Sequence, residues 1–276
     1  MNTRFSEALK SQLRRVIRFA DSVHSDAFDV SMPIHPSIGD LFLVGYPKSG
    51  NIWFSFMLGN VNLLMSGIDR RMTFFGGDDV IPSLERGRHI PEPSTSFPGF
   101  RVLQCHSSFN PKYSRVILLV RDPVDVIASH YKFLVDLGVF SGDIRQFVDH
   151  PGYGIAAWIS HTTGWLDGAS AARFSVTLCI VRYEELRADP AATLREIYQL
   201  LGFELPDHVI ATAVERANFA AMQADEARYN ARNPAWAGLK HVRREHTAGP
   251  RVAIDAELAE KIRTLARPVL DRLGYN

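Results

Sequence analysis

The sequence predicts a single α/β domain in which helices flank a central parallel sheet. Short apolar runs without alternation recur between helical patterns, as in strands that are covered on both faces. A glycine-bracketed loop of the phosphate-binding kind follows the first of these runs. A chain of 276 residues is long enough for one such domain with a sizeable core, and residues 1–35 are expected to add an N-terminal helical extension.

Four segments are predicted as strands, at Leu41–Val44, Arg101–Cys105, Val116–Val120 and Phe174–Val181. Helices are predicted where an aspartate can cap the first turn and a proline can occupy its first position. The pairs Asp122-Pro123 and Asp189-Pro190 meet this rule, and a glycine can end each helix, at Gly138 and Gly202. A terminal helix is expected over Asp255–Leu273, kinked or split at Pro268.

Two further segments are predicted to be irregular. Leu84–Gly99 is rich in proline and polar residues, which is typical of a loop. Met222–Pro250 has weak periodicity and many charges, so it is expected to lie over the surface. A basic amphipathic helix is expected near the start of the chain, packed on its own domain or lying on a membrane surface, with an apolar side made of Phe5, Leu9, Leu13, Val16 and Phe19.

The charge balance gives the chain no overall attraction to polyanions. Lysine and arginine number 31 against 30 aspartates and glutamates, so no nucleic acid is expected as a partner. No apolar run approaches the roughly 18 residues of a membrane span and no signal peptide is visible, so the expected location is cytoplasmic. Cys105 and Cys179 are too few for a disulfide framework or a zinc site, and we predict buried thiols.

The loop after the first strand departs from the usual phosphate-binding loop. In "LFLVGYPKSGNIWFSF", Gly45 and Gly50 have the spacing of the two Walker A glycines, which lysine and a Mg²⁺-binding serine or threonine normally follow. Here Asn51 and Ile52 follow, and Lys48 lies inside the loop. A strand that turns into a helix directs backbone N–H groups and the helix dipole at one spot. The sequence therefore predicts an anion site without a metal ligand.

Two more candidates lie at predicted strand ends. Arg121 ends the strand in "SRVILLVRDPVDVIASHYKF", where its forked side chain can bind a phosphate or pair with Asp122 or Asp125. Ser129 lies eight residues later on a polar row of the helix, either as a ligand or as a solvated residue. His106 follows the strand in "RVLQCHSSF", where an imidazole can act as a base near neutral pH or can be structural.

These three segments together resemble the cytosolic-type sulfotransferase family that uses 3′-phosphoadenosine 5′-phosphosulfate (PAPS). "YPKSGNIW" is similar to that family's 5′-phosphosulfate loop, YPKSGTTW, and "VILLVRDPVDVIASHY" is similar to its 3′-phosphate motif. "VLQCHSSF" is similar to the segment that carries its catalytic histidine. Weaker similarity continues in the family's order through "RYEELRADPAATLREIYQLLGF" and "NFAAM", from about Leu41 to Arg244.

The resemblance implies one sulfotransferase domain over residues 1–276 that moves a sulfuryl group in line from PAPS to an acceptor hydroxyl, without a metal. The donor would leave as adenosine 3′,5′-bisphosphate. His106 would be the general base and Lys48 would stabilise charge on the leaving phosphate, with Ser129 in the same catalytic set. The residues implied to bind the donor are Lys48, Ser49, Gly50, Asn51, Ile52, Trp53, Arg121, Ser129, Tyr183, Phe219, Met222, Arg243 and Arg244.

Three departures from the family pattern bear on this site. Asn51-Ile52 replaces Thr-Thr, although a backbone N–H needs no particular side chain. Gln104 stands where many relatives have lysine, which removes one positive charge beside the sulfuryl oxygens. Glu245 replaces a glycine after Arg243 and Arg244, so this pair is expected to matter less for the 3′-phosphate than Arg121 does.

Two other function classes stay open from the sequence. A phosphate-loop kinase or nucleotide hydrolase would need a Mg²⁺ ligand at Asn51 or Ile52, and a non-catalytic nucleotide-binding protein would not need both Lys48 and His106. The acceptor is open among small molecules, lipids and glycoconjugates, and a homodimer is an open alternative. Five aromatic residues line an acceptor pocket or belong to the core: Phe74, Phe75, Phe109, Tyr131 and Phe133.

Overall fold

The computed structural model describes residues 39–84, 94–233, 242 and 254–275. Its centre is a parallel four-stranded sheet in the spatial order β2-β1-β3-β4, made of β1 (Leu41–Val44), β2 (Val102–Cys105), β3 (Arg115–Val120) and β4 (Thr177–Arg182). Leu41 pairs in register with both Val102 and Arg115, so neighbouring strands start level and end at one edge. The predicted fold class, with a phosphate-loop-like turn after the first strand, is confirmed.

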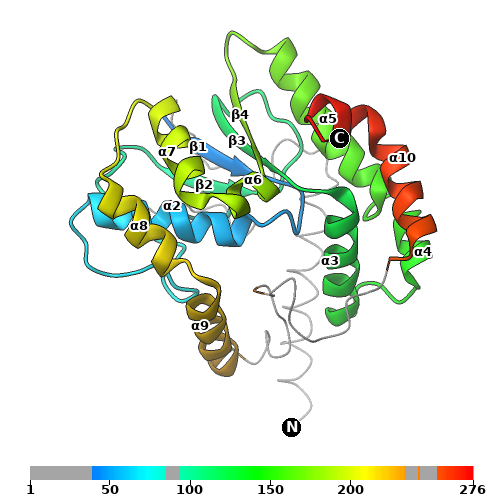
Figure 1. Ribbon diagram of the computed structural model, residues 1–276, viewed down its shortest axis with the longest axis horizontal. Coiled ribbons are helices and arrows are strands. Elements are labelled where there is room, and N and C mark those ends of the chain that lie inside the picture. Colours follow the sequence, from blue (N-terminus) through cyan, green and yellow to red (C-terminus); the bar gives the residue numbers. More distant parts are fainter. Residues whose placement is uncertain (1–38, 85–93, 234–241, 243–253, 276) are drawn as a thin grey trace, which may run out of the picture.

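Successive residues of β1 belong alternately to two separate cores. Phe42 and Val44 join the core beneath α3 (Pro123–Asp136), α5 (Ile155–Ala171) and α10 (Ala256–Arg272). Leu41 and Leu43 join the core beneath α2 (Asn51–Met65), α7 (Pro190–Leu200) and α8 (Asp207–Arg216). Figure 1 shows these two groups of helices on opposite sides of the sheet. Because both faces are covered, the strands carry the unbroken apolar runs seen in the sequence.

The predicted helix starts are confirmed by their caps. The Asp122 carboxylate accepts a hydrogen bond from the Val124 amide at 2.7 Å, and the Asp189 carboxylate accepts one from Ala192 at 2.9 Å. Asp255 caps α10 through the Leu258 amide at 2.8 Å. In each case the aspartate satisfies an N–H group that the first helical turn leaves without an internal partner.

Three sequence-based expectations need correction. The fourth strand begins at Thr177 instead of Phe174, which is 91% exposed. This strand is only partly buried because it forms an edge of the sheet. Cys179 on this strand is consequently half-buried, whereas Cys105 is buried, and both thiols are free. Of the two outcomes expected at Pro268, a kink or a split, the split does not occur, because the terminal helix runs as one element to Arg272.

The segment expected to be irregular after Met222 begins as the helix α9 (Phe219–Arg232). Two of its charged side chains are buried, and each accepts a backbone hydrogen bond there: Asp225 from Phe74 at 2.7 Å and Glu226 from Val242 at 3.1 Å. The helices α4 (Ile144–Val148), α5, α6 (Tyr183–Ala188) and α8 were not predicted as separate elements. The N-terminal extension and most of the Leu84–Gly99 loop lie outside the described residues.

Candidate active site

All four strands deliver a candidate residue to the same edge of the sheet. The loop 45–50 follows β1, His106 follows β2, Arg121 follows β3 and Tyr183 follows β4. Parallel strands whose carboxyl ends lie at one edge place such residues together, in the crevice where open α/β sheets bind ligands. The structure thus brings together the three segments that the sequence singled out, and it adds Tyr183 from the weaker fourth.

The loop after β1 has the backbone shape of an anion-binding turn. Its chain folds back through a hydrogen bond from the Ser49 amide to the Tyr46 carbonyl at 3.1 Å, and Lys48 and Gly50 have positive φ angles of 74° and 112°. The helix α2 begins immediately afterwards, with no capping side chain and no acidic residue in its first turn. The dipole of this 15-residue helix therefore points its positive end at the loop, and the first turn of the helix carries no acidic side chain to compensate it.

A buried hydroxyl in the same loop also fits a ligand. The Ser49 side chain is 1% exposed, and its Oγ finds no hydrogen-bond partner among the described residues. Buried polar atoms in folded proteins are nearly always paired, so such an atom needs an explanation. A phosphate or sulfate oxygen held by the loop would supply the missing partner.

Lys48 lies against an aromatic ring. Its Nζ is 4.3 Å from the centroid of the Phe133 ring, and this phenylalanine on α3 is buried. The negative face of the ring attracts the ammonium group without neutralising its charge. Phe133, one of the five aromatic residues considered for an acceptor pocket or the core, therefore contacts a candidate catalytic residue.

His106 is joined to the loop after β1 by a short hydrogen bond. Its Nδ1 lies 2.6 Å from the carbonyl oxygen of Gly45. A carbonyl oxygen can only accept, so Nδ1 carries the proton and donates it to this bond. In the neutral ring the unprotonated nitrogen is then Nε2, which is the tautomer that a general base needs.

The segment that carries His106 is held by α5, a helix that the sequence did not predict. Trp165 donates from its indole nitrogen to the Ser107 carbonyl at 3.0 Å, and its ring meets Phe109 edge-on at 5.3 Å. Gly168, one turn further along, lets Phe109 approach so closely that an added Cβ would lie 2.4 Å from the phenylalanine ring. The signal available in the sequence was the i, i+4 spacing of His161 and Trp165.

His161 itself is a buried, neutral histidine behind the site. Its ring contacts the Tyr46 ring edge-on at 5.7 Å, and its side chain is 4% exposed. Burial, followed by the proximity of His106, lowers the pKa of His161 from 6.5 to about 3. The core on this side of the sheet therefore depends on an imidazole that stays uncharged.

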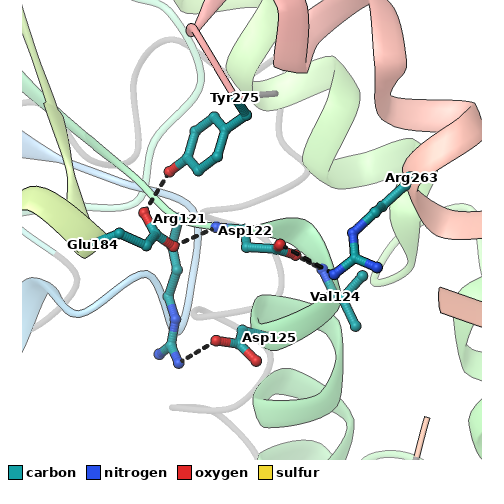
Figure 2. A network of polar contacts seen from close by, with 7 residues as sticks. All are labelled: Arg121, Asp122, Val124, Asp125, Glu184, Arg263 and Tyr275. Carbon is teal, nitrogen blue, oxygen red and sulfur yellow. Dashed lines mark hydrogen bonds and ion pairs between the residues drawn. The ribbon is translucent and has the colours of Figure 1, made fainter. Parts of the chain in front are cut away.

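Arg121 is held between an acid and an aromatic ring. Its guanidinium pairs with the Asp125 carboxylate at 3.1 Å (Figure 2), one of the two pairings that the sequence left open. It also stacks over the Tyr183 ring at 4.3 Å. The side chain is 11% exposed. Beside it lies a groove of about 290 Å³ whose lining includes Asp125, Tyr183 and Arg187. Arg121 thus presents a restrained positive charge near a surface groove.

The remaining candidates for donor binding differ in how deeply they are buried. Trp53 donates from its indole nitrogen to the Ala217 carbonyl at 3.1 Å and meets the Tyr183 ring edge-on at 5.8 Å. Phe219 is half-buried at the start of α9, whereas Met222 is 2% exposed and belongs to the core. Ser129 lies on α3, two turns beyond Arg121, and is half-buried. Arg243 and Arg244 lie outside the described residues.

Gln104 is joined to the helix after the loop. The Ser55 hydroxyl lies 2.6 Å from the Gln104 side-chain oxygen and 2.8 Å from the Asn51 carbonyl. The neutral Gln104 amide is therefore held against α2. Across residues 39–84, 94–233, 242 and 254–275, no three acidic, histidine or cysteine side chains are grouped as metal ligands. Within the same residues, every helix is too short or too polar to cross a lipid bilayer.

We expect Gly50→Ala to damage the loop more than its φ angle alone would. An alanine Cβ at Gly50 would lie 2.6 Å from the Tyr183 ring, in addition to the strain of a positive φ. The matched control is Gly67→Ala, because Gly67 also has a positive φ but has nothing within 4 Å of an added Cβ. Denaturant unfolding should show a loss of about 1 kcal/mol for Gly67→Ala and at least about twice that for Gly50→Ala. Equal losses would mean that Tyr183 does not pack on the loop.

We expect His161 to make the native state sensitive to acid. Its pKa is about 3 in the folded protein and near 6.5 when unfolded, so below pH 6.5 the unfolded state binds a proton that the native state excludes. The free energy of unfolding should then fall by about 1.4 kcal/mol per pH unit as the pH drops from 6.5 towards 3. Urea unfolding of His161→Gln should show a shallower fall, and His208→Gln, at an exposed site on α8, should match wild type. Parallel curves for wild type and His161→Gln would contradict this role.

Several curated proteins are similar to this chain over two-thirds of its length. Sulfotransferase 2A6 of Mus musculus is 28% identical over 206 residues, which cover 67% of this chain and 66% of the relative. Sulfotransferase 1A1 of Rattus norvegicus is 26% identical over 207 residues, with 67% of each chain covered. The 3-alpha-hydroxysteroid sulfotransferase of Cavia porcellus is 26% identical over 202 residues. The chain therefore spans about two-thirds of the length of these relatives.

Solved structures of related fold were also found. Retinol dehydratase in complex with androsterone and the inactive cofactor PAP superposes with a TM-score of 0.61 at 16% identity, covering 93% of this chain and 85% of that one. Mouse sulfotransferase SULT7A1 complexed with PAP has a TM-score of 0.60 at 18% identity, covering 89% and 90%. At these identities the likeness is one of fold.

A family assignment comes from the match along the chain itself. Residues 39–274 match the family described as the sulfotransferase domain, from just before β1 to the last turn of α10. This range holds the loop after β1, His106 and Arg121 in the order that the sequence motifs predict. The chain belongs to the sulfotransferase domain family.

Proposed function

We propose that this protein transfers a sulfuryl group from PAPS to a hydroxyl group of an acceptor. The observation that carries the proposal is the 2.6 Å bond between His106 Nδ1 and the Gly45 carbonyl, because it places a candidate base directly beside an anion-binding loop. Family membership supports the reaction class, and two solved structures of the same fold contain PAP. Ile52, where a phosphate-loop kinase would carry a Mg²⁺-binding hydroxyl, supports this reading over kinase or hydrolase chemistry.

In this proposal the loop binds the 5′-phosphosulfate. The backbone of Ser49, Gly50, Asn51 and Ile52 at the start of α2 faces the anion, and the unpartnered Ser49 hydroxyl adds a donor. Lys48 stabilises the charge that grows on the leaving 5′-phosphate as the bond to sulfur breaks. The Phe133 ring holds the ammonium group near the loop and leaves it charged.

The acceptor hydroxyl is activated by His106 in this proposal. With Nδ1–H donated to Gly45, Nε2 is the nitrogen that takes the proton as the oxygen attacks sulfur. The transfer is in line and resembles phosphoryl transfer, so positioning and charge stabilisation account for most of the catalysis. Gln104, held at Ser55, leaves the sulfuryl oxygens with one cation fewer than lysine would supply.

The nucleoside part of the donor is assigned to the residues around Tyr183. Arg121, just before α3, and Ser129, on α3, bind the 3′-phosphate, with Arg243 and Arg244 as further contributors. Trp53, Tyr183 and Phe219 contact the adenine, and the buried Met222 belongs to the core against which Phe219 packs.

We further propose that residues 1–276 form one sulfotransferase domain that acts in the cytoplasm. The acceptor is a hydroxyl-bearing small molecule, lipid or glycoconjugate.

Donor selectivity tests the nucleotide part of the proposal. Wild type should bind adenosine 3′,5′-bisphosphate at least about tenfold more tightly than 5′-AMP, because the 3′-phosphate adds a charge-assisted contact with Arg121. Arg121→Ala should remove most of this preference in calorimetric titrations. Arg145→Ala, which loses only exposed pairs with Asp255 and Glu257, is the matched control. Stronger stabilisation by ATP with Mg²⁺ than by the bisphosphate would instead support a kinase or hydrolase.

His106→Ala should reduce sulfuryl transfer by roughly 10²–10⁴-fold while changing the affinity for adenosine 3′,5′-bisphosphate little, because a general base acts on the acceptor and not on the nucleotide. Turnover can be followed with labelled PAPS and a mixed pool of phenols, sterols and glycosides. His208→Ala, at an exposed position on α8, should keep wild-type turnover. If His106→Ala loses nucleotide affinity but keeps turnover at saturation, then His106 is a binding residue and the proposed mechanism is wrong.

A further inference from the structure

The last residues of the described chain reach the edge of the candidate site. α10 ends in a left-handed turn at Gly274, with φ of 73°, and the Tyr275 amide donates back to the Leu270 carbonyl at 3.0 Å. This arrangement is the Schellman motif, which fixes the direction in which the chain leaves a helix. The Gly274 carbonyl also accepts a hydrogen bond from Arg182, at the end of β4, at 2.6 Å. Tyr275 is therefore held in place by its backbone.

The Tyr275 side chain ends on Glu184. Its hydroxyl donates to one carboxylate oxygen of Glu184 at 2.6 Å, and the other oxygen accepts the Asp122 amide at 2.9 Å (Figure 2). Burial, followed by the hydrogen bond with Glu184, raises the pKa of Tyr275 well above its usual range, so the hydroxyl keeps the proton that it donates. Both oxygens of this carboxylate thus have a defined partner, and one partner is Tyr275, which follows the last helix.

Glu184 connects the two segments that hold Arg121. Asp122 follows Arg121 directly and caps α3, while Tyr183 precedes Glu184 directly and stacks on the Arg121 guanidinium at 4.3 Å. The end of β3 and the start of α6 are therefore joined by two contacts. The Tyr183 ring stacks on the Arg121 guanidinium, and the Glu184 carboxylate accepts the Asp122 amide. Glu184 and Tyr183 also line the groove beside Arg121. A rotation of the Glu184 side chain would loosen its contact with the Asp122 amide, which directly follows Arg121.

We propose that Tyr275 is a positioning residue for the donor nucleotide: by fixing the Glu184 carboxylate on the Asp122 amide, it holds Arg121 in the orientation that binds the 3′-phosphate. This inference rests on the proposed function, because it concerns the same phosphate. It goes beyond that function by assigning the C-terminal turn a role in donor affinity. The site is then completed by the far end of the chain, over 150 residues after Arg121.

The test is a double-mutant cycle with Tyr275→Phe and Glu184→Ala. Tyr275→Phe keeps the ring and removes only the hydroxyl, and it should weaken binding of adenosine 3′,5′-bisphosphate by about three- to tenfold with a smaller effect on 5′-AMP. Glu184→Ala should weaken bisphosphate binding at least as much. Tyr275→Phe added to Glu184→Ala should have no further effect, since the tyrosine is proposed to act through this carboxylate. Independent, additive losses would overturn the proposal.

A matched control separates positioning from general loosening. Tyr198→Phe also removes a tyrosine hydroxyl, which donates to Asn62 at 2.8 Å in the core between α7 and α2. It should lower the midpoint of unfolding but leave bisphosphate affinity unchanged. If Tyr198→Phe weakens the bisphosphate as much as Tyr275→Phe does, the effect is one of overall stability and the proposal is wrong.

Amide hydrogen exchange gives a readout that needs no ligand. In the free protein, Tyr275→Phe should speed exchange in a peptide that covers residues 120–126, because the Asp122 amide loses a well-oriented acceptor. Unchanged exchange together with unchanged bisphosphate affinity would overturn the positioning role alone. Wild type that fails to bind the bisphosphate, while exchange responds as expected, would refute the proposed function and leave the Tyr275–Glu184–Asp122 contact established.

Discussion

The carboxyl ends of four level, parallel strands meet at one edge of a sheet that is buried on both faces, and the candidate site follows from this constraint. β1 has two neighbours in register, so its loop lies between the residues that follow β2 and β3. Hydrophobic burial of both faces leaves this edge as the place where polar groups can face solvent and a ligand. The hydrogen bond from His106 to Gly45 is a short contact that results, and it joins a candidate base to the loop after β1.

The two principal cations of the site are held by the same physical device. Lys48 lies over the Phe133 ring and Arg121 lies over the Tyr183 ring, at 4.3 Å in each case. An aromatic face orients a cation through its quadrupole but does not cancel the charge, so the cation can still attract an incoming phosphate. Asp125 does compete for Arg121, yet this carboxylate is 47% exposed and its pairing is weakened by solvent. Such an arrangement keeps positive charge in place before any ligand binds.

Histidines on this side of the sheet have divided roles. His106 is half-buried at the site edge, whereas His161 is buried behind it and remains neutral because desolvation lowers its pKa to about 3. A charged His161 would repel a protonated His106, which is the state that a general base reaches after taking the acceptor proton. The neutral imidazole of His161 therefore favours the chemistry proposed for His106. Trp165 and Gly168 on the same helix fix the segment that follows His106 through Ser107 and Phe109.

Local signals in the sequence determined the fold class, the strand cores, the three capped helix starts and the loop between Gly45 and Gly50. Each of these depends on a few adjacent residues: an apolar run, an aspartate before a proline, or the spacing of two glycines. The same signals identified Lys48, His106 and Arg121, because a residue at the end of a parallel strand lies at the binding edge whatever the rest of the chain does.

Only the tertiary structure decided the partners of these residues. α5 buries one side, but this side includes the polar His161 and Thr162, whereas Ala156 and Ala171 lie on the exposed side, so its apolar pattern is weak and its contact with the segment after His106 was missed. The exposure of Phe174 and the partial burial of Cys179 depend on β4 being an edge strand, and strand order cannot be read from local composition. The choice of Asp125 over Asp122 for Arg121 and the contact of Tyr275 with Glu184 depend on distances between separate elements. Sequence periodicity reports which side of an element is apolar, whereas pairing between elements is set by how the whole chain packs.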